Sequence, residues 1–185
     1  MINVAPIWLP ELQQQNYRIV LEAMSRPGHC QNLFFDGEQQ AYIALLASLL
    51  DQAVTLADPH GLIHEDDFAL LQSQRVCPEQ ADFILCRGDQ SPAIQPKLGT
   101  LPSPELSATL VILVEKIHGA EGSLTLRLTG PGVNGRANVA ITGWERQWLS
   151  AREDWVSRFP LGVDILLVDN SRVMALPRTT TVEIV

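Results

Sequence analysis

Short runs of apolar, β-forming residues place the strongest constraint on how this chain folds. The run from Leu110 to Val114 is far shorter than the roughly 20 residues that a membrane-spanning helix needs, so we expect no membrane span. The segments with this character are candidate strands at 82–87, 109–117, 124–130, 162–169 and 172–177. Turn residues separate the second from the third and the fourth from the fifth, which predicts two β-hairpins.

Helical patterns alternate with these strands. The first predicted helix, 10–25, has Pro10 at its first position and Glu11 in its first turn. Further helices are predicted at 39–57, 66–74 and 143–159. Thr142 and Glu145 form a capping-box pattern ahead of the last one.

The length and the order of these elements predict one α/β domain over residues 1–185. Helices that alternate with strands usually cover the faces of a parallel sheet, and hairpins add antiparallel pairs. We therefore expect a three-layer α/β/α sandwich with a mixed β-sheet.

Composition excludes several classes of partner and compartment. The net charge of −8 and the presence of only two lysines, Lys97 and Lys116, make duplex nucleic acid a poor partner. Cys30, Cys77 and Cys86 form an odd set without C-x-x-C spacing, which predicts reduced thiols rather than disulfides or a zinc–thiolate site. The N-terminal segment lacks the pattern of a signal peptide. These features indicate a cytoplasmic protein.

The segment from Gly130 to Gly135 matches the dinucleotide-binding pattern G-x-G-x-x-G. That pattern binds pyrophosphate through the amides at the start of a helix that follows the glycines. Here Pro131 removes one amide, and residues 136–143 lack helical periodicity. A tight turn at the end of a strand is therefore favoured over a nucleotide site.

Two further patterns suggest chemistry but lack its geometry. His60 and His64 are spaced like metal ligands on a helix, yet Pro59 and Gly61 indicate a turn, so we expect a solvated loop without a metal. A cysteine also follows a histidine at 29–30, but no third orienting group can be assigned, so no nucleophilic site is predicted.

Aromatic residues gather near one face of the helix predicted at 143–159. They are Trp144, Trp148, Trp155 and Phe159, and Arg152 is assigned to the opposite, polar face. Such a stripe usually packs in the core. Contact with a partner protein is the alternative, because tryptophan is a preferred interface anchor.

Arg178, Thr179 and Thr180 follow a predicted strand, where a guanidinium and two hydroxyls can receive a phosphate or phosphonate. Structural pairing of Arg178 with a carboxylate is the alternative. The candidate anion or interface site comprises Arg26, Gly130, Gly132, Asp164, Arg178, Thr179 and Thr180.

Several motifs occur in a defined order along the chain. They are EAMSRPG at 22–28, GT at 99–100, PELSATL at 104–110, LRLTGPGV at 126–133, FPLGVDILLV at 159–168 and ALPRTTTVEI at 175–184. With this order and spacing the sequence resembles, nearly end to end, the PhnH family, the H subunits of the bacterial carbon–phosphorus lyase complex.

The resemblance implies a place in a cytoplasmic assembly that lets bacteria use phosphonates as a phosphorus source. In that assembly the G, H and I subunits, with the L protein, form α-D-ribose 1-methylphosphonate 5-triphosphate from ATP and methylphosphonate, and the J subunit cleaves the carbon–phosphorus bond. The implied partners are the G, I and J subunits and a second copy of the chain. The implied fold is that of pyridoxal-phosphate-dependent transferases without the cofactor.

We therefore expect a structural subunit that has no cofactor and no catalytic residues of its own. Neither Lys97 nor Lys116 lies in a recognisable pyridoxal phosphate context, and no nucleophile, base and orienting group can be placed together. The alternatives are a small transferase that acts on a phosphonate or nucleotide near Arg178, and a ligand-sensing module for phosphonates.

Overall fold

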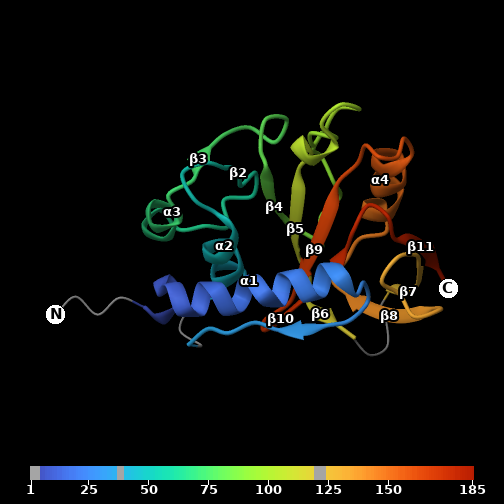
Figure 1. The fold of residues 1–185 in the computed structure, drawn as a ribbon, viewed down its shortest axis with the longest axis horizontal. Helices are drawn as coiled ribbons and strands as arrows, with labels where there is room; N and C mark the ends of the chain where they lie inside the picture. Colours follow the sequence, from blue (N-terminus) through green and yellow to red (C-terminus); the bar gives the residue numbers. More distant parts are fainter. Residues whose placement is uncertain (1–4, 37–39, 119–123) are drawn as a thin grey trace.

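The computed structural model describes residues 5–36, 40–118 and 124–185. It is an α/β structure with two β-sheets (Figure 1). The helices are α1 (Pro10–Ser25), α2 (Ala41–Leu49), α3 (Glu65–Leu71) and α4 (Gln147–Val156), with 3-10 turns η1 (Pro6–Trp8) and η2 (Pro104–Leu106). The strands are β1 (Gln31–Asn32), β2 (Thr55–Ala57), β3 (Gln74–Arg75), β4 (Phe83–Arg87), β5 (Thr109–Leu113), β6 (Lys116–Ile117), β7 (Leu124–Thr129), β8 (Ala137–Thr142), β9 (Asp164–Val168), β10 (Arg172–Leu176) and β11 (Thr181–Ile184).

The larger sheet has seven strands in the order β1-β10-β9-β5-β4-β2-β3. The strands from β9 to β3 in this order run parallel, whereas β10 pairs antiparallel with both β9 and β1. The expected mixed sheet is therefore confirmed, and so is the hairpin that joins β9 to β10. The central strands are nearly all apolar because parallel strands are usually buried on both faces.

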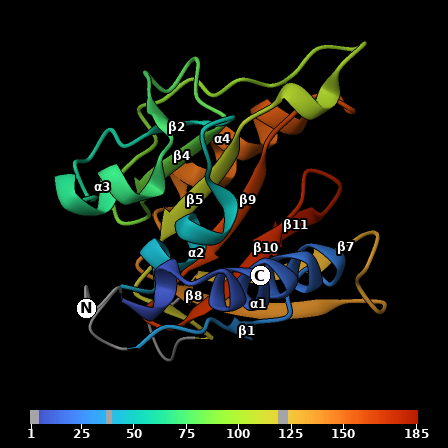
Figure 2. The same ribbon diagram turned by 60° about the vertical axis from the view of Figure 1, so that its left-hand side comes forward.

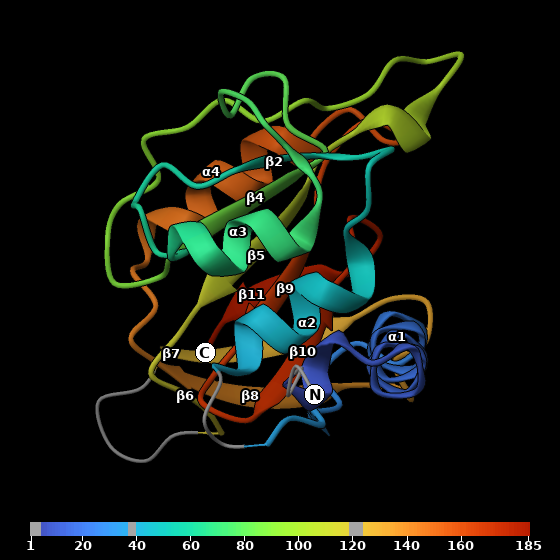
Figure 3. The same cartoon turned by 90° about the vertical axis from the view of Figure 1, so that its left-hand side faces the viewer.

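Alternating side chains of the central strands divide the hydrophobic core into two parts. Leu85, Val111 and Leu166 pack with α1 and α2 on one face, where α2 is buried almost all round. Residues one position away, such as Ile84 and Leu110, pack with α4 and the second sheet on the other face. Figure 3 shows α2 and α3 in front of β4, β5 and β9, and α4 behind them.

The second sheet is antiparallel, with the order β11-β7-β8-β6. The hairpin predicted between 109–117 and 124–130 is wrong, because β5 lies between β4 and β9 whereas β7 pairs with β8 and β11. The chain passes from one sheet to the other after β5: the Val114 amide donates to Val168, and the next amide, of Glu115, donates to Thr142. Most of the predicted turn, 119–123, lies outside the described residues.

Helix boundaries agree with the prediction only for α1, which spans Pro10–Ser25 as expected. The helix predicted at 39–57 ends at Leu49, and its last residues form β2; its predicted first residue, Gln39, lies outside the described residues. The chain turns after α2 because the Asp51 carboxylate accepts the Ala53 amide at 2.8 Å. The helix predicted at 66–74 is α3, which spans Glu65–Leu71.

The capping box predicted ahead of α4 is also wrong. Thr142 is the last residue of β8 and pairs with Lys116, so α4 begins at Gln147 with Arg146 as its N-cap residue. The predicted range 143–159 therefore shortens to ten residues. Among the described residues, no helix is both long enough and apolar enough to cross a membrane.

The glycine-rich segment 130–135 connects β7 to β8 as a turn, and a strand rather than a helix follows it, as predicted. Gly130 and Gly132 have φ angles of 128° and 79°. A Cβ atom on Gly132 would lie 2.2 Å from the Ser25 carbonyl oxygen, and one on Gly130 would lie 2.9 Å from that of Thr179. These glycines are needed because two other backbone segments pack directly against the turn.

Gly132→Ala tests this requirement. We expect it to lower the free energy of unfolding by about 3 kcal/mol, because it combines a strained φ with a backbone clash. Gly135→Ala is the matched control: its φ is 70°, but nothing lies within 4 Å of the added Cβ, so a loss of only about 1 kcal/mol is expected. Urea denaturation measures both values, and equal losses would contradict the packing argument.

Candidate functional site

Three turns that are distant in the sequence meet beside the second sheet. The glycine turn packs through Gly132 against Ser25 and Pro27, just after α1, and through Gly130 against the backbone of Thr179 and Thr180. Figure 1 shows this end of α1 reaching β7 and β8. The structure thus brings the predicted site residues of all three motifs into one region, named here the three-turn region (25–28, 130–135 and 177–180).

Arg26 and Arg178 have different roles in this region. Arg26 is exposed and pairs with Glu22 at 3.0 Å along α1. Arg178 is mostly buried, and its Nη2 lies 2.6 Å from Oδ2 of Asp164, the first residue of β9. The Arg178 backbone amide also donates to Asp164 Oδ1 at 2.7 Å. Structural pairing with a carboxylate, the alternative considered for Arg178, is the arrangement observed.

The remaining donors of Arg178 are also engaged within the protein. Nε approaches both Asp164 oxygens at 3.3 Å, and Nη2 also donates to the Ser107 hydroxyl at 2.5 Å. Nη1 donates to the carbonyls of Pro104 at 3.0 Å and Pro160 at 3.3 Å. Since arginine has five N–H groups, each of them has an acceptor here. Arg178 therefore ties the end of β10 to β9, η2 and the segment after α4.

Arg152 on α4 contacts this region, and its predicted place on the polar face of the helix is wrong. Its side chain is not on the polar face of α4 but is only 4% exposed. Nη2 donates to the carbonyls of Pro177 and Thr180, both at 2.8 Å. Its burial could have been predicted from the sequence, because Arg152 follows the fully buried Trp148 by four residues and so shares its helix face.

The tryptophans predicted as a stripe are mainly core residues. Trp144 and Trp148 are buried, and Trp148 Nε1 donates to the Gln90 carbonyl at 2.7 Å. The rings of Trp148 and Trp155 meet edge to face, with centroids 6.4 Å apart. Phe159 differs, because it lies beyond the end of α4 and is 68% exposed.

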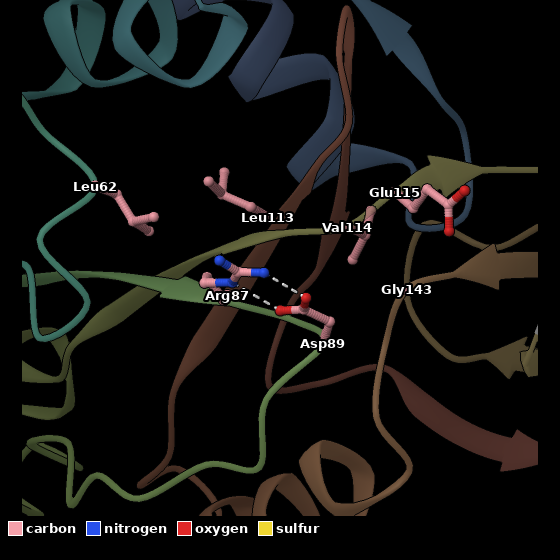
Figure 4. A pocket seen from close by; sticks show the side chains of 7 residues that line it. All are labelled: Leu62, Arg87, Asp89, Leu113, Val114, Glu115 and Gly143. Carbon is pink, nitrogen blue, oxygen red and sulfur yellow. Dashed lines mark hydrogen bonds and ion pairs between the residues drawn. The ribbon is translucent and has the colours of Figure 1, made fainter.

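A second candidate site lies at the carboxyl ends of β4 and β5, the edge where open α/β sheets usually bind ligands (Figure 4). The cavity there measures about 470 Å³. Arg87 crosses it to pair with Asp89 through bonds of 2.9 and 2.6 Å, and Glu115 adds a further carboxylate. With its one arginine paired, the cavity has an acidic balance that opposes an anionic substrate.

Two of the three thiols are at least partly buried, and two of the histidines accept backbone amides. Burial raises the pKa of Cys30 to about 11 and that of Cys86 to about 12, so both thiols stay protonated at neutral pH. His60 Nδ1 accepts the Arg87 amide, whereas His64 Nδ1 accepts the Asp66 amide at the start of α3. In the described parts of the chain, no three His, Cys, Asp or Glu side chains are grouped to hold a metal ion.

The two arginine pairs give a test of the Arg178 network. We expect Arg178→Ala to lower the free energy of unfolding by about 3–5 kcal/mol, because it leaves the largely buried Asp164 carboxylate without its cation. Arg26→Ala, which breaks an exposed pair, should change it by less than about 0.5 kcal/mol. Chemical denaturation compares the two variants, and a similar loss in both would show that the Arg178 network is not stabilising.

Comparison with known proteins completes the description. The family model described as bacterial phosphonate metabolism protein (PhnH) matches residues 7–183. A protein of Stutzerimonas stutzeri named putative C-P lyase subunit protein HtxG is 37% identical over 178 residues, which cover 96% of this chain and 89% of that protein. The Rhizobium meliloti (strain 1021) protein named alpha-D-ribose 1-methylphosphonate 5-triphosphate synthase subunit PhnH is 36% identical over 86 residues, or 46% of this chain and 42% of that protein. The chain therefore belongs to the PhnH family of bacterial phosphonate metabolism proteins, as its motifs predicted.

Proposed function

We propose that this chain is a subunit of a bacterial carbon–phosphorus lyase complex in the cytoplasm. With the G, I and L proteins it supports formation of α-D-ribose 1-methylphosphonate 5-triphosphate from ATP and methylphosphonate. The family match over residues 7–183 and the printed names of the two relatives support this role. The proposed partners are the G, I and J subunits and a second copy of the chain.

The proposed role is structural rather than catalytic, and one observation supports it most: four arginine and lysine side chains that could stabilise developing charge are bound to carboxylates. Transfer requires groups that orient two substrates and stabilise developing charge. The ion pairs Asp164–Arg178, Asp169–Arg172, Asp82–Lys97 and Asp89–Arg87 have N–O distances of 2.5–2.6 Å. The first three pairs are partly or largely buried and so already serve the fold, whereas Arg87–Asp89 is about half exposed.

The proposed fold class is a three-layer sandwich like that of pyridoxal-phosphate-dependent transferases, without the cofactor. Helices α1 and α2 cover one face of the central strands, and α4 together with the second sheet covers the other, which supports this class. The chemistry of that cofactor begins at a free lysine amine. Lys97 instead lies 2.5 Å from Asp82 as a partly buried ion pair, and Lys116 is on a short strand of the second sheet.

Exposed apolar side chains near the Arg178 network offer a surface for a partner subunit. Leu101, Leu106 and Phe159 are 72%, 57% and 68% exposed. Arg178 donates to the backbone carbonyl of Pro104, close to Leu101 and Leu106 in the sequence, and to that of Pro160, next to Phe159. Large apolar side chains on a fixed backbone are typical of interface anchors. We assign this surface to a neighbouring subunit of the complex.

Adenine release tests the proposed role. Given ATP and methylphosphonate, the isolated chain should release no adenine, whereas a mixture of all four proteins should release it and omission of this chain should reduce the rate. Chromatographic measurement of free adenine follows the reaction. Release by the isolated chain above that of a heat-inactivated control would establish the transferase alternative instead.

The same mixture tests the assigned surface. Replacing both Leu101 and Phe159 by Ser should weaken co-purification with the partner subunits, because it removes the apolar anchors, while the free energy of unfolding changes by less than about 1 kcal/mol. Arg18→Ala, an exposed polar change on α1, is the control. Unchanged co-purification of the double variant would remove this surface from the proposal.

A further inference from the structure

A separate cavity of about 500 Å³ is lined by residues of α4, the 177–180 turn and β11. Its floor contains Arg152 and Thr180, which are 4% and 2% exposed. Leu149, Val156 and Val182 supply an apolar wall. A cavity of this size suits a small ligand, and the few polar groups at its floor would decide which one.

The polar groups on the floor are not satisfied within the protein. Both hydrogen bonds of the Arg152 guanidinium come from Nη2, so the N–H groups on Nε and Nη1 have no acceptor in the described parts of the chain. Nε and the Thr180 hydroxyl are fully buried without a partner, whereas Nη1 is not among the fully buried atoms. Nη1 is therefore the part of the guanidinium that the cavity reaches.

This arrangement is costly unless the unused donors find an acceptor. Buried polar groups in folded proteins nearly always have hydrogen-bond partners, and buried charges are nearly always paired. Arg152 has no ion-pair partner among residues 5–36, 40–118 and 124–185, since Asp164 is already bound to Arg178. Burial lowers the pKa of Arg152, and only the charge of Asp164 opposes this change. An acceptor-only ligand at the floor would remove the deficit.

We propose that this cavity binds a small tetrahedral oxyanion, the head group of a phosphonate or phosphate, through Arg152 and Thr180. Nη1 supplies the first contact, and a small rotation of the two side chains gives Nε and the hydroxyl an acceptor as well. Three donors on two residues match the three oxygens of such a group better than the two of a carboxylate. An alkyl substituent packs against Leu149 and Val182.

The position of other charges is consistent with a small ligand. Glu153 also lines the cavity, but it is exposed at the rim, where water and salt screen its charge. Arg178 lines the same cavity with its donors already used, so it adds positive potential without a direct contact. Ligand binding by this chain itself goes beyond the structural role proposed above.

Calorimetric titration of the full chain with methylphosphonate, inorganic phosphate and acetate tests the site. We expect saturable binding of the first two anions and weaker binding of acetate. Arg152→Gln should weaken binding by about tenfold or more, and Thr180→Val by about threefold, whereas the exposed Arg158→Gln should have no effect. The Arg152 Nε–H signal in NMR spectra should shift with the same saturation.

Thr180→Val keeps the proposal falsifiable even if Arg152→Gln fails to fold. It replaces an unpartnered hydroxyl by a methyl group of the same shape, so a purely structural Thr180 predicts equal or higher stability and unchanged anion binding. No saturable binding of either phosphorus oxyanion, binding unaffected by Thr180→Val, or acetate binding as tight as that of methylphosphonate would each overturn the proposal.

Tighter binding of methylphosphonate than of phosphate would support an organic phosphonate as ligand, and the reverse would support free phosphate. These results do not depend on adenine release, so either proposal can fail alone.

Discussion

Burial of the central parallel strands on both faces is the constraint on which the rest of the structure depends. β4, β5 and β9 present apolar side chains in both directions, so the chain must supply two separate covers. α1 and α2 form one of them. The other combines α4 with a second sheet, and the chain begins that sheet immediately after β5, where consecutive amides at Val114 and Glu115 bond to different sheets. Burial thus also decides which strands are neighbours.

The local sequence pattern correctly predicted helices and hairpins whose signals lie within the element itself. It failed where a strand pairs with another strand that is distant in the sequence. α1 has its Pro and Glu start signals, and the β9–β10 hairpin closes over a short turn, so both were found. β5 and β7 have equally strong strand character, but β-propensity does not say that β5 pairs with β9 through the register Thr109–Asp164. Thr142 likewise has capping chemistry, yet the ladder with Lys116 takes its backbone. Tertiary pairing overrode local preference in both cases.

The two arginines of the candidate site also show that local sequence does not reveal distant contacts. Sequence alone pointed to Arg178 because of the two threonines that follow it, but whether an arginine is free depends on the acceptors around it. Asp164, Ser107 and two carbonyls use all of its donors. Arg152 donates to the carbonyls of Pro177 and Thr180 in the same turn and keeps donors unused. Both arginines hold the turn and line the cavity, but only Arg152 has free donors, a distinction that only the packed structure shows.

Net charge and local field have opposite consequences for this chain. At −8 the molecule as a whole repels a polyphosphate such as ATP, and the cavity at the carboxyl edge of the main sheet adds carboxylates to that effect. Around Arg152 the balance reverses, since a desolvated guanidinium interacts far more strongly at short range than screened surface charges do at a distance. A small oxyanion at the proposed site would lie beside Arg152, although the exposed carboxylate of Glu153 also lines the cavity. The proposed anion site therefore depends on the field around Arg152, which the net charge of the chain does not reflect.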